Sequence, residues 1–168
     1  MFQLTDHMAT LAKLTTRTEK HGDDDVPAAS LRLKVAVASS LLDMFNPALK
    51  KTFYCKPRVG DQQRIPFENG DDRTAIAIPE IKHVGWDAEY PGYGLAIGVG
   101  LEASDPVRLS DVTLSKFAFE FIDGGSAVIE FSVAGTPDGE QVARLYEWQG
   151  QELQLTLEPP KSAQQKAA

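Results

Sequence analysis

The stretch KFAFEFIDGGSAVIEFSV, residues 116–133, decides the fold class of this 168-residue chain. Two runs of alternating apolar residues flank Asp123-Gly124-Gly125, and such residues accept the positive φ angles of tight hairpin turns. An alternation with period two is typical of a strand with one buried face. The stretch therefore predicts an antiparallel hairpin. We interpret the row formed by Phe117, Phe119 and Phe121 as the core face of a sheet rather than as a platform for stacking bases.

The same alternation recurs elsewhere in the chain. Residues 31–37, LRLKVAV, alternate large apolar residues with Arg32, Lys34 and Ala36. The runs TAIAIP, GLAIGVGL and VTLSKFAFEFI follow a similar pattern, as do the leucines at 153, 155 and 157. The glycine-rich GYGLAIGVG has no lysine and no helix start, so it is interpreted as a closely packed strand and not as a phosphate-binding loop.

Two short helices are predicted between the strands, at residues 40–46 and 137–149. Each has residue types that are common at helix starts. The expected starts are Ser40 with Asp43, which resemble a capping box, and Thr136 as a cap followed by Pro137.

These patterns predict a single, mainly β domain over residues 1–160, with a disordered tail at 161–168. With 42% hydrophobic residues the chain can bury a core without disulfides or metals. The expected architecture is an antiparallel β-sandwich or an open barrel, with an OB-like fold among the possibilities.

Composition suggests a reducing environment. Cys55 is the single cysteine, so no internal disulfide can form. The first residues lack the basic region, apolar run and cleavage site of a secretory signal. The uncharged runs fall far short of the roughly 20 apolar residues that span a membrane. We therefore expect a cytoplasmic protein without membrane association.

Positive charge is concentrated in one place. The chain has a net charge of −7, yet residues 46–67 hold five basic residues against the single acid Asp61. Within this region KKTFYCKPR, residues 50–58, interleaves cations with aromatic rings, the combination that single-stranded nucleic acid needs for its backbone and its bases. The predicted nucleic-acid-binding residues are Lys50, Lys51, Phe53, Tyr54, Lys56, Arg58 and Arg64. The alternative is a solvated loop in which Phe53 or Tyr54 anchors a short helix to the core.

Catalytic and metal-binding patterns are lacking in the sequence. The run His21-Gly22-Asp23-Asp24-Asp25 has ligand-type residues but no recognised spacing, and it is interpreted as an acidic turn between strands. No nucleophile motif accompanies the three histidines. We therefore predict a non-enzymatic binding protein without catalytic residues, metal or cofactor.

Three segments carry a resemblance to a known family: residues 2–33, the stretch IPEIKHVGWDAEYPGYGLAI at residues 78–97, and the hairpin SKFAFEFIDGGSAVIEFSV. Together with the turn RTEKHG at 17–22 and the strand entry PAASL at 27–31, they resemble an uncharacterised family of small bacteriophage proteins. The similarity extends to Pro159. It implies an early-region protein of an infected cell that acts beside recombination and nuclease functions. The chain departs from many single-strand binders because it ends in KSAQQKAA rather than in an acidic tail.

The function that these observations favour is single-stranded DNA binding in phage replication or recombination, in the host cytoplasm. The alternative is an acidic inhibitor that binds a host defence or replication protein, either anti-CRISPR-like or as a DNA mimic. A virion structural component is the third possibility. The expected partners are single-stranded DNA or a host or phage protein. A homodimer is also expected, because long strands of a sandwich leave edges that need cover.

Overall fold

The structure is a computed structural model, and it describes residues 1–58, 60, 71–100 and 105–161. Of the sequence-based predictions, Arg64 and the tail from residue 162 lie outside the described residues.

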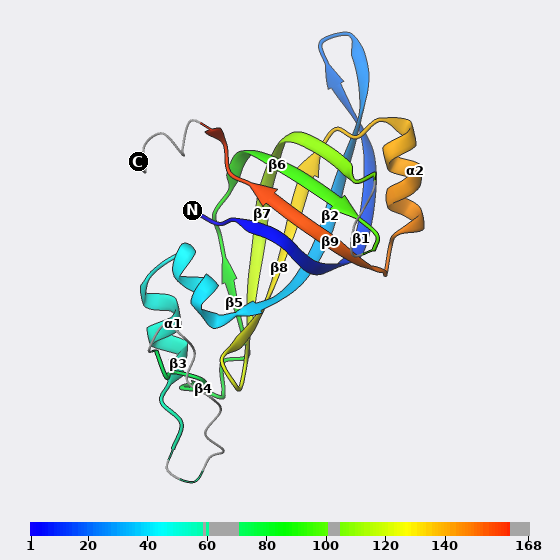
Figure 1. Cartoon of the computed structure of the whole chain (residues 1–168). Coiled ribbons are helices and arrows are strands. Elements are labelled where there is room, and N and C mark those ends of the chain that lie inside the picture. The colour runs from blue at the N-terminus through cyan, green and yellow to red at the C-terminus, as the bar shows by residue number, and fades with distance from the viewer. Residues whose placement is uncertain (59, 61–70, 101–104, 162–168) are drawn as a thin grey trace.

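Six antiparallel strands close into a barrel (Figure 1). Around the wall the order is β7, β6, β9, β1, β2 and β8, and β8 pairs with β7 to close it. The wall strands are β1 (Leu4–His21), β2 (Asp24–Ala38), β6 (Tyr90–Gly98), β7 (Val107–Ile122), β8 (Ser126–Gly135) and β9 (Glu152–Glu158). This confirms the mainly β, antiparallel fold class. Of the two expected architectures, the chain adopts the barrel and closes its wall.

Smaller elements are attached to this wall. The short strand β5 (His83–Trp86) extends the sheet beside β7, and β3 (Tyr54–Cys55) pairs with β4 (Ala75–Ile76) in a separate ribbon. The helices are η1 (Ser39–Met44), α1 (Ala48–Phe53) and α2 (Gly139–Glu147). None of the described helices is both long and apolar enough to cross a membrane.

The hairpin predicted from residues 116–133 is confirmed as β7 and β8. Gly124 and Gly125 adopt φ angles of 99° and 84° in the connecting turn, a region in which side chains other than glycine are strained. Phe117, Phe119 and Phe121 all lie in the core, so their predicted role as a core face is also confirmed.

An aromatic cluster fills the end of the barrel nearest to α1. Phe2 contacts Phe45, Phe117 and Phe131 at ring-centroid distances of 4.8, 5.9 and 5.8 Å. Phe45 belongs to the η1–α1 segment, which crosses this end of the barrel in Figure 1. The aromatic contacts therefore hold η1 and α1 against the barrel, and this fixes the position of the basic stretch that α1 carries.

The helices differ from prediction in their starts and in their number. Asp138 is the N-cap of α2, and it forms a capping box with Gln141 in place of the expected Thr136 and Pro137 start. No side chain caps η1, so the Ser40–Asp43 capping box is wrong. The helix α1 was not predicted. Pro47 is its N-cap, and proline's fixed φ is compatible with a helix start.

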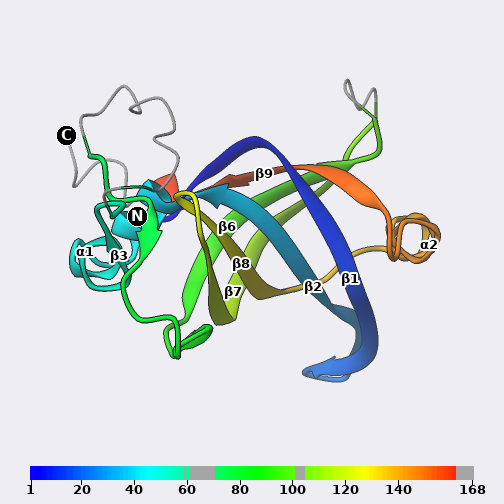
Figure 2. The same ribbon diagram turned by 90° about the horizontal axis from the view of Figure 1, so that it is seen from below.

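The strands β1 and β2 extend past the barrel as a two-stranded arm (Figures 1 and 2). We define the arm as residues 17–28, where β1 and β2 pair only with each other. Gly22, at a φ of 67°, turns the chain at its tip. The interpretation of residues 21–25 as an acidic turn between strands is therefore confirmed. The arm lies at the opposite end of the barrel from α1.

Candidate nucleic-acid interface

The basic stretch 50–58 runs from the last turns of α1 through β3. It packs beside the β7–β8 hairpin, because the Tyr54 hydroxyl donates a hydrogen bond to the Ser126 carbonyl and accepts one of 3.3 Å from the Ile122 N–H. The Gly124 N–H also donates to the Thr74 carbonyl at 2.8 Å. These bonds fix the stretch at one end of the barrel.

Tyr54 belongs to the core. Its side chain is 1% exposed and its ring lies edge-on to Phe121 at 5.9 Å. Burial raises the pKa of the Tyr54 phenol above its ordinary value, with a partial offset from the Ile122 hydrogen bond and a further rise from the Asp123 carboxylate. Such burial leaves no ring face for a base, and Tyr54 fits the anchoring role that the sequence left open.

Phe53 is placed differently from its neighbour. It is half-buried, and it stacks on Phe121 at 4.2 Å with an interplanar angle of 13°. One face of the ring is thus covered by Phe121, and the ring keeps partial contact with solvent. Of the two aromatic residues predicted to stack with bases, Phe53 is the one that a base can approach.

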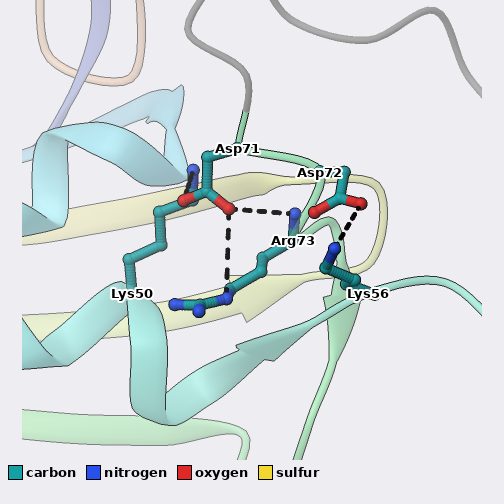
Figure 3. A network of polar contacts seen from close by, with 5 residues as sticks. All are labelled: Lys50, Lys56, Asp71, Asp72 and Arg73. Carbon is teal, nitrogen blue, oxygen red and sulfur yellow. Dashed lines mark hydrogen bonds and ion pairs between the residues drawn. The ribbon is translucent and has the colours of Figure 1, made fainter.

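Acidic residues that the prediction did not include pair with the cations of this stretch (Figure 3). The Lys50 Nζ lies 2.8 Å from Asp71, and the Lys50 side chain is only 9% exposed. The Lys56 Nζ lies 3.1 Å from Asp72, but its side chain is 72% exposed. Lys50 is therefore a nearly buried, paired cation, whereas Lys56 remains open to solvent.

Asp71 is the centre of this polar network. The Arg73 backbone N–H donates to Asp71 at 3.2 Å, and the Arg73 guanidinium lies 4.0 Å from it. The hydrogen bond from Lys50 is the main reason that the pKa of Asp71 lies below its ordinary value, against an opposing effect of burial. Asp71 therefore stays ionised at neutral pH and keeps Lys50 in place.

The described residues retain an excess of positive charge at this end of the barrel. We call the group the α1–β3 patch; it comprises Lys50, Lys51, Lys56, Arg58 and Arg73 with Asp71 and Asp72. Five cations against two acids leave an excess of three. Lys51, Lys56 and Arg58 are exposed. Arg73 was missed because the basic region was counted only to residue 67, and its two acidic neighbours were missed with it.

No comparable cluster of metal ligands occurs in the described ranges. Within them, no group of three or more His, Cys, Asp or Glu side chains is arranged to hold a metal ion. On the β1 side of the exposed arm, the His21 ring lies 3.8 Å from the Glu19 carboxylate, two residues away on the same strand.

Comparisons with protein-family models, curated proteins and solved structures found no match to this chain. The resemblance to small phage proteins therefore stays a prediction.

Proposed function

We propose that this chain binds single-stranded DNA through the α1–β3 patch. The observation that carries the proposal is the gathering of exposed cations around one half-exposed ring, at one end of a protein whose net charge is −7. Cations attract the backbone without regard to sequence, and an aromatic face accepts any base. In the phage setting suggested by the resemblance, such binding would serve replication or recombination.

Each side chain of the patch has a different part in this proposal. Lys51, Lys56 and Arg58 contact phosphates, and a phosphate can replace Asp72 at the exposed Lys56 amine. Lys50 and Asp71 position α1, because the Lys50 side chain is nearly buried and its amine is held by the partly exposed Asp71 carboxylate. A base stacks against the accessible part of Phe53, while Tyr54 only holds the segment in place.

The first test measures binding of oligo-dT at several salt concentrations. Affinity should fall as salt rises, because each neutralised phosphate releases counterions, and duplex DNA of equal length should bind more weakly. Exchanging Lys51 and Lys56 for Gln should reduce the salt slope by about 1.4, since each single-strand phosphate contact contributes about 0.7. The matched control exchanges Lys20 and Lys161, which lie elsewhere, for Gln and leaves the slope unchanged. Absence of oligo-dT binding at low salt would refute the proposal.

The second test concerns the ring. Phe53→Ala should weaken oligo-dT binding by roughly 1–3 kcal/mol if a base stacks there. The variant also loses the contact with Phe121, so its thermal unfolding must be measured beside binding. A Phe53→Ala protein that is folded at the assay temperature and binds like the parent would remove stacking from the proposal and leave the cations.

A second candidate function is supported by the arm. Its exposed residues include Asp23, Asp24 and Asp25 on a projection that carries Glu19 as well, against Arg17 and Lys20. This surface could occupy a basic site on a host defence or replication protein as DNA would. Two results together would favour this function. The parent protein should hold one stoichiometric host partner without binding oligo-dT, and exchanging the three aspartates for Asn should abolish binding of that partner.

A further inference from the structure

A second group of cations lies on the outer wall of the barrel, outside the α1–β3 patch. Lys13 on β1 is directly opposite Arg32 on β2, and Lys34 follows on the same face of β2. Across β8 and onto β7, Ser132 is opposite Ser115, and Lys116 stands at the bulge that follows Ser115. The four cations point outward because the intervening residues of these strands fill the core. We call Lys13, Arg32, Lys34 and Lys116 the cationic wall.

A single described acid lies among these cations. Glu130 on β8 accepts a hydrogen bond of 2.5 Å from the Arg32 Nε and lies 3.0 Å from the Lys34 Nζ. Among the described residues, neither the Lys13 nor the Lys116 side chain forms a hydrogen bond or an ion pair. Four cations against one acid leave an excess of three positive charges.

Two features of the cationic wall are unfavourable for the isolated fold. Like charges directly opposite each other on neighbouring strands repel, and Lys13 and Arg32 are such a pair. Lys116 has a φ of 53°, a left-handed conformation that strains side chains other than glycine, Asn and Asp. Stability alone would favour an acid opposite Arg32 and a glycine at the bulge. An anionic partner would offset the repulsion.

The shape of this surface suits an extended polymer. The short polar side chains Ser115 and Ser132 lie between Arg32 and Lys116 across the strands, and Ser132 is buried, so a ligand would meet the long cationic side chains rather than the strands. Lys13 and Lys116 are three strand spacings apart, about 14 Å at a spacing near 4.8 Å. The cationic wall also lies close to the basic stretch. Along β8, Glu130 is four residues from Ser126, which is about 13 Å, and the Ser126 carbonyl is bonded to Tyr54 of the basic stretch.

We propose that the cationic wall is a second phosphate-binding site, which contacts the backbone of the same DNA single strand that the α1–β3 patch binds. The proposal rests on the proposed function, and charge complementarity selects the occupant. The phosphates lie across Lys13, Arg32 and Lys116. The wall adds affinity without sequence preference, because its cations contact phosphates, which are the same at every nucleotide.

The direct test exchanges the two unpaired cations. Lys13→Gln with Lys116→Gly breaks no ion pair in the described residues, and the glycine relieves the strained φ at the bulge. We expect this variant to melt at least as high as the parent, to bind oligo-dT more weakly and to show a salt slope reduced by about 1.4. The Lys20→Gln, Lys161→Gln control changes net charge equally and should bind like the parent. A well-folded wall variant with parental affinity and slope would overturn the inference.

A variant with the opposite effect makes the test stronger. Glu130→Gln removes the acid that engages Arg32 and Lys34, so that both cations become available to phosphate. We expect tighter oligo-dT binding than in the parent. Unchanged or weaker binding would contradict a phosphate site on this wall.

Mapping by NMR separates this inference from the proposed function. If oligo-dT shifts the amide signals of Lys13 and Arg32 as well as those of Lys51 and Lys56, both proposals stand. Shifts confined to residues 50–58 would overturn the cationic wall alone, and the absence of any shift would refute DNA binding itself. A further outcome is that the amide signals of the cationic wall shift with protein concentration in the absence of DNA. This would overturn the inference and indicate instead that the wall contacts the acidic arm of a second copy.

Discussion

Tyr54 joins the α1–β3 segment to the β7–β8 hairpin through one hydroxyl group. Tyr54→Phe leaves the ring in place but removes the partner of the Ser126 carbonyl and the Ile122 N–H. We expect the free energy of unfolding to fall by about 1 kcal/mol, as for loss of a typical hydrogen bond. Urea unfolding measures the change. Oligo-dT affinity at a temperature where both proteins are folded should be equal, and a loss of affinity would return Tyr54 to the binding site.

Glu130 should make stability depend on pH in the acid range. Burial acts to raise the pKa of Glu130, but hydrogen bonds and charge from Arg32 and Lys34 outweigh it and hold the pKa below its ordinary value. A lowered folded pKa means that the stabilisation is present above the ordinary carboxyl pKa and is lost as the pH falls through the folded value.

Glu130→Gln should therefore be less stable than the parent at neutral pH, and the difference should disappear in acid. Unfolding measured at a series of pH values checks this, with the exposed Glu89→Gln as a control that does not reproduce the pattern. A difference in stability that stayed constant from neutral to acid pH would show that the ion pairs of Glu130 do not contribute.

The capping box of Asp138 and Gln141 fixes where α2 starts. The Asp138 side chain accepts a 2.8 Å bond from the Gln141 N–H, and the Gln141 amide oxygen accepts a 3.0 Å bond from the Asp138 N–H. Asp138→Ala should cost about 1 kcal/mol in thermal or urea unfolding. Thr136→Ala should have little effect, although its sequence position favours a cap. The reverse ranking would mean that α2 begins earlier.

How well each strand could be predicted depended on how regular its alternation is. Buried positions alternate with period two in β9, in β2 from Ala29 onward, and in β8 up to Phe131, and these stretches were predicted in whole or in part. The alternation of β1 is broken twice, between Leu4 and His7 and again between Leu11 and Lys13, and Asp6 adopts a φ of 51°. A bulge inserts a residue and reverses the pattern of buried faces, so a period-two search does not find the strand.

The candidate site was predictable as a cluster but not in its parts. A local run of cations and rings identified residues 50–58, because charge density is a property of the sequence. Burial is not, and neighbouring positions such as Phe53 and Tyr54 can differ completely. The ion pair of Lys50 with Asp71 joins residues separated by 20 others, a pairing that only the folded chain creates.

For the whole molecule, closure of the barrel changes the argument for self-association. Every wall strand has a neighbour on both sides over part of its length, so the exposed edges on which the expected homodimer depended are fewer than in a sandwich. The described strands with one neighbour are β3, β4 and β5, together with the arm segments of β1 and β2. Any dimer formed by edge pairing would use one of these.

The arm should be dispensable for folding. Of its residues 17–28, only Ala28 is buried. Replacing residues 17–28 by a two-residue Asn-Gly turn should therefore leave the barrel folded, with a melting temperature within a few degrees of the parent's, measured by circular dichroism. A host partner that no longer binds this variant would engage the arm, whereas oligo-dT binding should persist. Loss of the folded barrel would show that the arm supports the wall.

The position of β9 has a consequence for synthesis of the chain on the ribosome. This strand, at residues 152–158, lies between β1 and β6, so its main pairing partners include residues translated about 150 positions earlier. Until it emerges, β1 and β6 each expose an unsatisfied row of peptide groups, and contacts so distant in sequence form slowly. At roughly 5–20 residues per second, β1 waits roughly 7–30 seconds for this partner. During that interval chaperones or other nascent chains have their best opportunity to bind it.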